Sequence, residues 1–277
     1  MAPIESTLEK EYDLGPRQNK GDSSYYSYSD RFSHWGPDGR IARQEFVTGY
    51  FTQEVIGFRH GGAPVFKVVR NHTDMQTASG EEGVSSPVSL EFGERFTYEV
   101  CFEDDFDYFS VDTSTFPNTL PGFMMFENIV HSHTFAVLAS RTHGALDKLR
   151  KVGTTVTIPD SGKSGQVEFP GFISVKLVRG QSTMTFLGLS EHRGEPVALL
   201  SYDIPLEFPS IAGGTGMARA TGLIWFSLRR GEILKGMLRQ TTQLALPGPE
   251  GQPFASYIEA EGLLEKISRE EYPIPVD

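Results

Sequence analysis

Three of the seven histidines lie in one stretch of the chain, residues 121–144, and their spacing has consequences for chemistry. On a β-strand, His131 and His133 would project from the same face. They could then bind a divalent transition metal together with His143 or with the distant His192. On a helix, residues two apart are roughly 200° apart around the axis, so they could not share one ion. The secondary structure of this stretch therefore decides between a metal site and another chemistry.

The spacing of apolar residues in 121–144 favours the helix. The side chains on one helical face would be Phe126, Ile129, Val130, His133 and Val137. A histidine titrates near neutral pH, so His133 is a candidate acid/base group, with Glu127 as its helper. The alternative is a core histidine satisfied by one hydrogen bond, which is the commoner situation of a lone histidine on an apolar face. Under the helix interpretation no metal is expected.

Aromatic residues are abundant, with 20 Phe and 10 Tyr, and several cluster near the beginning of the chain. The segment 23–29 contains three tyrosines, and a tryptophan follows shortly after it. Ligand cavities are commonly lined by such side chains, so we expect an apolar or aromatic small molecule as the partner. The residues predicted to contact it are Tyr26, Tyr28, Trp35, Phe126 and Trp225.

Nucleotide cofactors are not expected, because two glycine-containing segments lack residues that their motifs require. Gly162-Lys163-Ser164 would form a phosphate loop only with a glycine at the position of Thr157. The segment 209–221 would need a glycine at Arg219 to form a dinucleotide fingerprint. The formal net charge of −11 and the pI of about 5.2 argue against nucleic acid or an anionic membrane as partners, because both need a basic patch.

Short segments rich in β-branched and aromatic residues, separated by Gly/Pro turns, predict strands over most of the chain. The polar and glycine-containing segments 71–87 and 209–221 are predicted to be loops. The expected fold class is mainly β (α+β): a bent antiparallel sheet or partial barrel with one central helix packed on its concave face. Residues 1–22 are polar and are predicted to form a mobile N-terminal arm, and 23–277 a single β-rich domain. The pattern His-x-Gly-x-Pro-Val occurs twice and raises the hypothesis of an internal duplication, 23–120 and 121–277.

The sequence contains one cysteine, no run of 18 apolar residues and no basic-then-apolar leader, so a cytoplasmic protein without membrane insertion is expected. The predicted function is a cofactor-free isomerase, cyclase or lyase of biosynthesis, acting on an apolar or aromatic metabolite in a β-barrel-like cavity. Two alternatives stay open: a non-catalytic carrier for a hydrophobic ligand, and a metal enzyme using His131, His133 and His143. The oligomeric state is not determined by the sequence.

Overall fold

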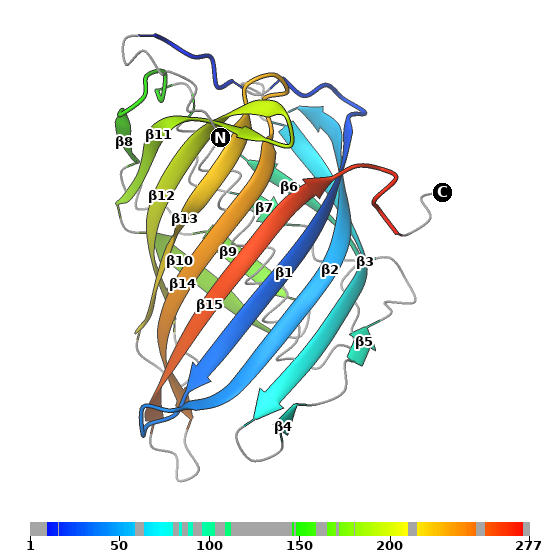
Figure 1. The fold of residues 1–277 in the computed structure, drawn as a ribbon. Coiled ribbons are helices and arrows are strands. Elements are labelled where there is room, and N and C mark those ends of the chain that lie inside the picture. The colour runs from blue at the N-terminus through cyan, green and yellow to red at the C-terminus, as the bar shows by residue number, and fades with distance from the viewer. Residues whose placement is uncertain are drawn as a thin grey trace.

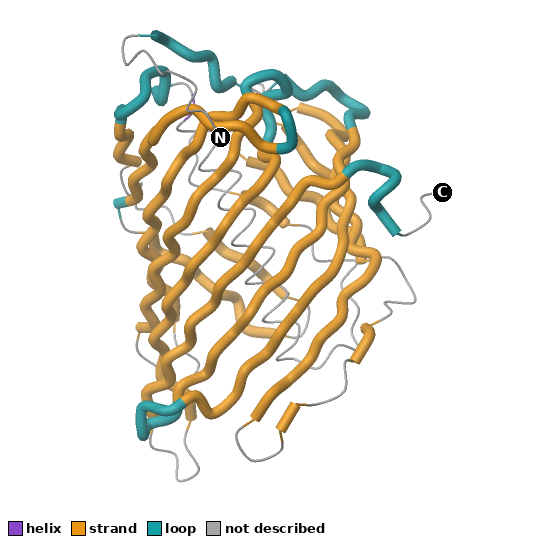
Figure 2. Tube along the Cα trace, in the orientation of Figure 1, coloured by secondary structure: helices purple, strands orange, loops and turns teal. Residues whose placement is uncertain are grey.

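The computed structural model of this protein describes most of the chain outside its middle part. The described residues are 10–15, 17–58, 64–79, 83–84, 88–90, 96–102, 109–111, 146, 148–158, 165–169, 172–179, 181–209, 215–247 and 253–273. Nearly all of them lie in long strands or in the turns that join the strands (Figures 1 and 2).

The described strands belong to one antiparallel sheet. Those of the N-terminal part are β1 (Ser23–Trp35), β2 (Ile41–Phe58), β3 (Pro64–Ser79), β4 (Gly83–Val84), β5 (Val88–Leu90), β6 (Phe96–Phe102) and β7 (Phe109–Val111). Those of the C-terminal part are β8 (Thr155–Ile158), β9 (Gly165–Phe169), β10 (Phe172–Arg179), β11 (Ser182–His192), β12 (Glu195–Pro209), β13 (Thr215–Ser227), β14 (Ile233–Pro247) and β15 (Pro253–Ile267).

The first and last strands lie side by side in the middle of the sheet. Its main order is β7-β6-β3-β2-β1-β15-β14-β13-β12-β10-β9, while β11 pairs with β12 and β8, and β4 and β5 pair with β3. The sheet rolls strongly, so that Cα atoms of its end strands β7 and β9 approach within 8 Å (Figure 1). No hydrogen-bonded ladder joins these two strands among the described residues, so the sheet is open.

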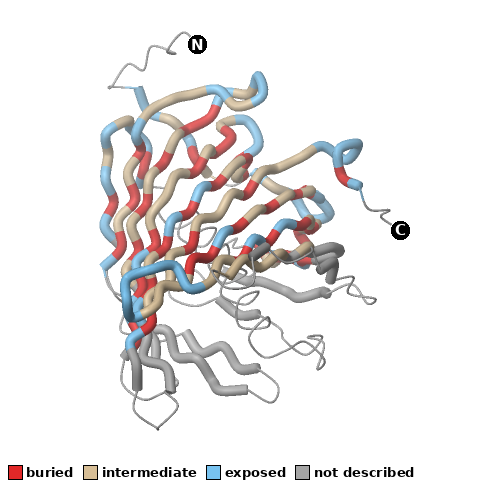
Figure 3. Tube along the Cα trace, turned by 60° about the horizontal axis from the view of Figure 1, so that its bottom comes forward, coloured by how far each residue is buried: buried red, intermediate tan, exposed pale blue. Residues whose placement is uncertain are grey.

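Alternating burial gives the sheet one buried face and one solvent-facing face. In β1 the residues at even positions from Ser24 to Phe32 are buried, whereas Tyr25, Ser27, Ser29 and Arg31 are half-buried or exposed. Side chains of a strand alternate between the two faces, so a period of two aligns the buried set on one side. Because the sheet rolls, we call the buried side the concave face and the other the convex face (Figure 3).

Two hairpin turns at one end of the sheet have specific backbone requirements. Between β11 and β12, Arg193 and Gly194 both have positive φ, 50° and 78°, as a two-residue hairpin turn with the right twist requires. Between β13 and β14, the backbone N–H of Ser227 donates to the carbonyl of Glu232 at 2.8 Å, and Gly231 has φ of 64°. These turns place residues 192–195 and 227–232 at the same end as the start of β1.

Two glycines on the concave face let larger side chains lie across the sheet. Tyr202 crosses Gly222 and its hydroxyl donates to the carbonyl of Met237 at 2.9 Å. A Cβ on Gly222 would lie only 2.6 Å from Cζ of Tyr202, and a Cβ on Gly262 only 2.6 Å from Oδ1 of Asp30. A glycine within a strand commonly marks such a close approach.

The predicted fold class is wrong in its central helix. The described residues form one open sheet, and apart from Leu146 alone none of them is helical. The prediction assumed that an open sheet needs a helix to cover its apolar side. Here the sheet rolls until β7 and β9 come near each other, so its buried face curves toward itself. Residues 121–144, where the helix was predicted, lie outside the described residues.

Two segments predicted as loops also contain strand. We predicted a loop over 71–87 and another over 209–221, but β3 continues to Ser79 and β13 begins at Thr215. Both predictions relied on polar and glycine residues, which a long strand accommodates on its solvent-facing side. In the predicted N-terminal arm, Leu14 is buried and the ring of Tyr12 packs edge-on against Phe186 at 5.8 Å.

The predicted units 23–120 and 121–277 contribute strands to one continuous sheet, because β1 pairs with β15. The duplication itself stays a prediction. In the part of the chain that the structure describes, no helix is long and apolar enough to cross a membrane.

The close approach at Gly222 predicts a large effect of one methyl group. The Gly222→Ala variant should be destabilised by about 1–3 kcal/mol, since the new Cβ collides with the backbone carbonyl oxygen of Met237 and with Tyr202, and overpacking of this kind costs that much. Urea unfolding followed by circular dichroism measures the difference. Gly188→Ala is the matched control, because a Cβ at Gly188 has no described atom within 4 Å. Equal stability of the two variants would contradict the packing described here.

Candidate functional site

The middle of the concave face is an apolar surface that runs across six strands. Successive partners in the registers of β1, β15, β14, β13, β12 and β11 are Tyr28, Leu264, Gly236, Ile224, Leu200 and Phe186, and all six are buried. We call this set the apolar rung. Next to it, two residues nearer the start of β1, Tyr26 stacks on Phe51 with ring centroids 5.0 Å apart. The rung and this stack form a continuous aromatic and aliphatic surface.

Gly236 leaves a gap among the described side chains of the apolar rung. It is buried, yet a Cβ built on it would have one described atom within 4 Å, the Cβ of Leu264 at 3.7 Å. Its two cross-strand neighbours, Leu264 and Ile224, carry full-sized side chains. At Gly236, therefore, the described side chains leave backbone uncovered at the centre of a buried apolar surface.

Charged residues occupy the concave face toward the other end of β1 and β2. The guanidinium Nη2 of Arg43 pairs with Oε1 of Glu45, and Nε2 of His34 lies 3.9 Å from the same oxygen. Asp30 lies on the same face, two residues after Tyr28. We call Asp30, His34, Arg43 and Glu45 the charged cluster. Side-chain exposure within the cluster increases from Glu45, which is 0% exposed, to Arg43, which is 42% exposed.

Two polar residues of β14 extend the charged cluster across the sheet. Nε2 of Gln240 donates to Oγ1 of Thr242 at 3.0 Å, and both side chains are buried. In register, Gln240 faces Ala260, whose other partner is Phe32, and Thr242 faces Ile258, whose other partner is His34. The small side chain of Ala260 separates Gln240 from the β1 strand. The end of the concave face that holds the charged cluster thus combines hydrogen-bond donors and acceptors from β1, β2 and β14.

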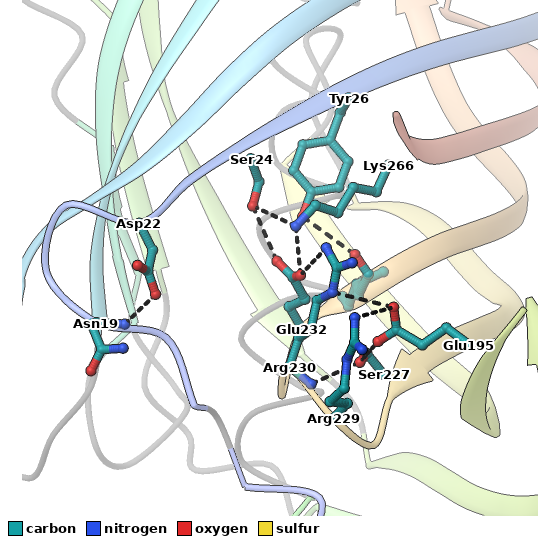
Figure 4. A network of polar contacts seen from close by, with 11 residues as sticks. Asn19, Asp22, Ser24, Tyr26, Glu195, Ser227, Arg229, Arg230, Glu232 and Lys266 are labelled. Atoms are coloured by element: carbon teal, nitrogen blue, oxygen red, sulfur yellow. Dashed lines mark hydrogen bonds and ion pairs between the residues drawn. The ribbon is translucent and has the colours of Figure 1, made fainter. Parts of the chain in front are cut away.

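A second polar network lies at the opposite end of the concave face (Figure 4). Nζ of Lys266 pairs with Oε1 of Glu232 and donates to Oγ of Ser24 at 3.0 Å, while Ser24 donates to Oε2 of Glu232 at 3.1 Å. Nε of Arg230 lies 3.2 Å from Oε2 of Glu195 and joins the β13–β14 turn to β12. The network therefore ties the start of β1 to the end of β15 and to the neighbouring turns.

Tyr26 borders this network on the concave face (Figure 4). Its hydroxyl donates to the carbonyl of Ile233 at 3.3 Å. Burial, and then the negative charge of Glu232, raise the pKa of Tyr26 well above its usual value. Tyr26 is therefore a neutral hydrogen-bond donor at any ordinary pH, and it is not a base.

The residues predicted to contact a ligand are distributed over both faces. Tyr26 and Tyr28 lie on the concave face, as part of the surface described above. Trp35 is half-buried at the end of β1, with its ring 6.4 Å from that of Tyr257. Trp225 lies between two concave-face residues of β13, so its side chain is on the convex face, where Nζ of Lys235 stands 5.2 Å from the ring centroid. The structure thus brings together two of these residues and separates Trp225 from them.

The predicted catalytic residues His133 and Glu127, and Phe126 beside them, lie outside the described residues. The same holds for His131 and His143 of the alternative metal site. His192 is described, and its Nε2 lies 3.5 Å from Oε1 of Glu265. Burial, opposed by the charge of Glu265, lowers the pKa of His192. Across the ranges given above, no three residues of His, Cys, Asp or Glu are grouped so that they could hold a metal ion.

Sequence reasoning missed the charged cluster and the Glu232–Lys266 pair. Asp30 follows Tyr26 and Tyr28 at a spacing of two, and Glu45 precedes Val47 at the same spacing. A strict period of two would have placed both carboxylates on the buried face. No local signal marks Glu232 or Lys266, because they meet only through the pairing of distant strands.

Comparisons with known proteins give no family for this chain. No family model matches it, and no curated protein sequence does. Among solved structures it is similar to lipovitellin, from a study of lipid–protein interactions, with 12% identity and a TM-score of 0.48. That match covers 94% of this chain and 26% of the lipovitellin chain, so this chain spans about a quarter of it.

Two further solved structures match over nearly all of their length, with low TM-scores. DynF, from the dynemicin biosynthesis pathway of Micromonospora chersina, matches with 8% identity and a TM-score of 0.28, covering 98% of this chain and 95% of DynF. A protein with a YmcC-like fold from Bacteroides fragilis NCTC 9343 matches with 9% identity and a TM-score of 0.25, covering 94% and 100%. All three TM-scores lie below 0.5, so these likenesses assign neither a fold family nor a function.

The buried Lys266–Glu232 pair predicts a strong dependence of stability on both partners. Lys266→Met should cost about 3 kcal/mol, because it leaves a buried carboxylate with a weaker partner, Arg230 at 3.7 Å. The double variant Lys266→Met/Glu232→Gln should recover about 1–3 kcal/mol of this loss. Urea unfolding of the four proteins in the double-mutant cycle measures both values.

The exposed pair Arg31–Glu261 on the convex face is the control for this cycle. Arg31→Met should cost about 0–1 kcal/mol, as exposed ion pairs usually do. If Lys266→Met cost no more than Arg31→Met, the network would not hold the end of the sheet together.

Proposed function

We propose that this protein binds an apolar or aromatic small molecule against the concave face of its sheet. The observation that carries the proposal is the gap at Gly236 within the buried apolar rung. A ligand ring or chain in contact with Leu264 and Ile224 there would meet carbon atoms on both sides. Small-molecule sites are typically concave and mostly apolar, with few polar groups that fix orientation, and the concave face has this composition.

The expected affinity follows from the area that such a contact buries. A ligand that loses about 300 Å² of apolar surface gains roughly 7 kcal/mol, at about 25 cal/mol per Å². The loss of translational and rotational freedom offsets part of this gain. Binding in the micromolar to millimolar range therefore needs little more than the apolar rung, and polar contacts would add to it.

Buried charges on the same face support ligand binding over a purely structural core. Burying Asp30 and Glu45 costs free energy that even a good ion pair seldom returns in full, and an apolar pair is often more stable. A sheet core with no other role is better served by apolar residues at these positions. Their presence next to the apolar rung is expected if they contact part of a ligand.

A second candidate function is cofactor-free acid/base catalysis on the bound molecule, as in an isomerase or lyase. The observation that favours it is the position of His34 on the same face of β1 as Tyr28, with Nε2 3.9 Å from the buried carboxylate of Glu45. An imidazole oriented by a carboxylate is a common general base. His133 and Glu127 stay predicted alternatives for this role, and a transition metal held by His131, His133 and His143 stays a prediction.

Titration with the neutral aromatic dye N-phenyl-1-naphthylamine tests the proposed function. The wild-type protein should enhance the fluorescence of the dye saturably. Gly236→Leu should weaken binding by at least about tenfold, because its side chain would fill the gap in the apolar rung. Unfolding curves would show that the variant is folded, and Gly236→Ala, whose Cβ fits at 3.7 Å, serves if it is not.

Met237→Leu is the matched control for this titration, since Met237 is the next residue of β14 and is 45% exposed on the convex face. This variant should bind the dye as the wild type does. No saturable binding by the wild type, or equal binding by a folded Gly236→Leu variant, would refute the proposed site.

A further inference from the structure

The convex face carries an exposed apolar strip where β13, β14 and β15 lie side by side. In register, Leu223 of β13 pairs with Met237 of β14, and Met237 pairs with Leu263 of β15. Met237 is 45% exposed, and its two partners are half-buried. Trp225, the next convex residue of β13, extends this set, and we call the four residues the apolar strip. Large apolar side chains grouped on a solvent-facing surface commonly mark an interaction site.

The convex sides of β14 and β15 carry opposite charges. Between residues 235 and 241, β14 contributes two cations to this face, whereas β15 contributes three carboxylates between residues 259 and 265. In register, the successive pairs are Lys235 with Glu265, Met237 with Leu263, Arg239 with Glu261, and Thr241 with Glu259. A positive strand therefore lies beside a negative one, and the apolar strip crosses both.

One end of this surface is covered within the chain. Nη2 of Arg193 lies 3.1 Å from Oε1 of Glu265, so the turn between β11 and β12 lies against that end of β15. The exposed part of the surface therefore extends from the apolar strip to Arg239 and Glu261, whose side chains are 65% and 43% exposed. These four elements, two apolar and two charged across the two strands, are open to a second molecule.

A two-fold axis would place the opposite charges of two such surfaces face to face. If the axis runs along the strands between β14 and β15, β14 of one copy lies over β15 of the other at the same level. Met237 then meets Leu263 of the other copy, and Arg239 meets its Glu261. Each contact occurs twice, as in every isologous interface. Sheets that pack face to face lie about 10 Å apart, a distance that side chains of this size span.

We propose that this surface is a dimer interface with a second copy of this chain, arranged about that two-fold axis. The contact buries the apolar strip of both copies, and the Arg239–Glu261 pairs at its border fix the register, as complementary charges do in interfaces. A surface that complements itself is what a homodimer requires, because the same patch serves both copies. The interface lies on the convex face, so this inference is independent of the proposed function.

Sedimentation velocity of the full chain tests the inference. At about 0.15 M salt, which screens the repulsion between two chains of formal net charge −11, the wild type should approach twice the 30.7 kDa mass of one chain as its concentration is raised to about 200 µM. Met237→Lys should weaken dimerisation at least about tenfold, because it buries an unpaired charge in the apolar strip twice per dimer.

Charge reversal tests the two-fold arrangement. Arg239→Glu and Glu261→Arg should each weaken self-association at least about tenfold, because each puts two like-charge contacts into the interface. An equimolar mixture of the two variants should dimerise as the wild type does, because both contacts of the mixed dimer then join opposite charges. Arg17→Glu is the control: it reverses a charge in the exposed Arg17–Asp13 pair before β1 and should self-associate like the wild type. Circular dichroism checks that each variant is folded.

Three results would overturn the inference. The first is a wild type that stays monomeric over the whole concentration range. The second is a dimer that Met237→Lys, Arg239→Glu and Glu261→Arg leave unchanged, since it would use a different surface. The third is a mixture of the two charge variants that stays monomeric while each variant is folded, since the two-fold arrangement requires recovery. Dye binding at the concave face is measured separately, so the proposed function stands or falls by its own titration.

Discussion

The pairing of β1 with β15 is the constraint on which the rest of the structure depends. It joins the first and last strands, and without it the described strands would form two separate sheets, one from each part of the chain. The contact between Ser24, Lys266 and Glu232 reinforces this pairing at one end, where buried charges must be paired to be tolerated. The rolling of the sheet, and hence its concave face, requires this continuous order of strands.

The concave face combines three zones along the strands, and each follows from residue type and register. The ion-paired network occupies one end, the apolar rung the middle, and the charged cluster the other end. An enclosed apolar surface is stabilising for the fold by itself. The gap that the described side chains leave at Gly236 and the burial of Asp30 and Glu45 are the observations from which ligand binding at this face is proposed.

Part of this organisation could be predicted from the sequence. The alternation around Tyr26 and Tyr28 predicts a strand and places both tyrosines on one face, as the structure shows. The same periodicity extends to Asp30, but a carboxylate on a buried face is unexpected unless its surroundings are known. Those surroundings come from Gly262, more than 200 residues away in the chain, and no local pattern gives the register between the two strands.

The wrong predictions have related causes. A central helix was predicted from local spacing and from the need to cover an open sheet, but local spacing does not show how far a sheet will roll. The loops predicted at 71–87 and 209–221 were based on polar and glycine residues. Long strands such as β3 and β13 tolerate these residues, because one of their faces meets solvent or a neighbouring side chain fills the space of a missing Cβ.

The most direct measurement is a crystal structure of the protein with N-phenyl-1-naphthylamine bound. The account predicts electron density for the dye on the concave face, over Gly236 and in contact with Leu264 and Ile224. Density for the dye on the convex face, beside Met237 or Trp225, would contradict it. So would an unoccupied concave face in crystals of protein that binds the dye saturably in solution.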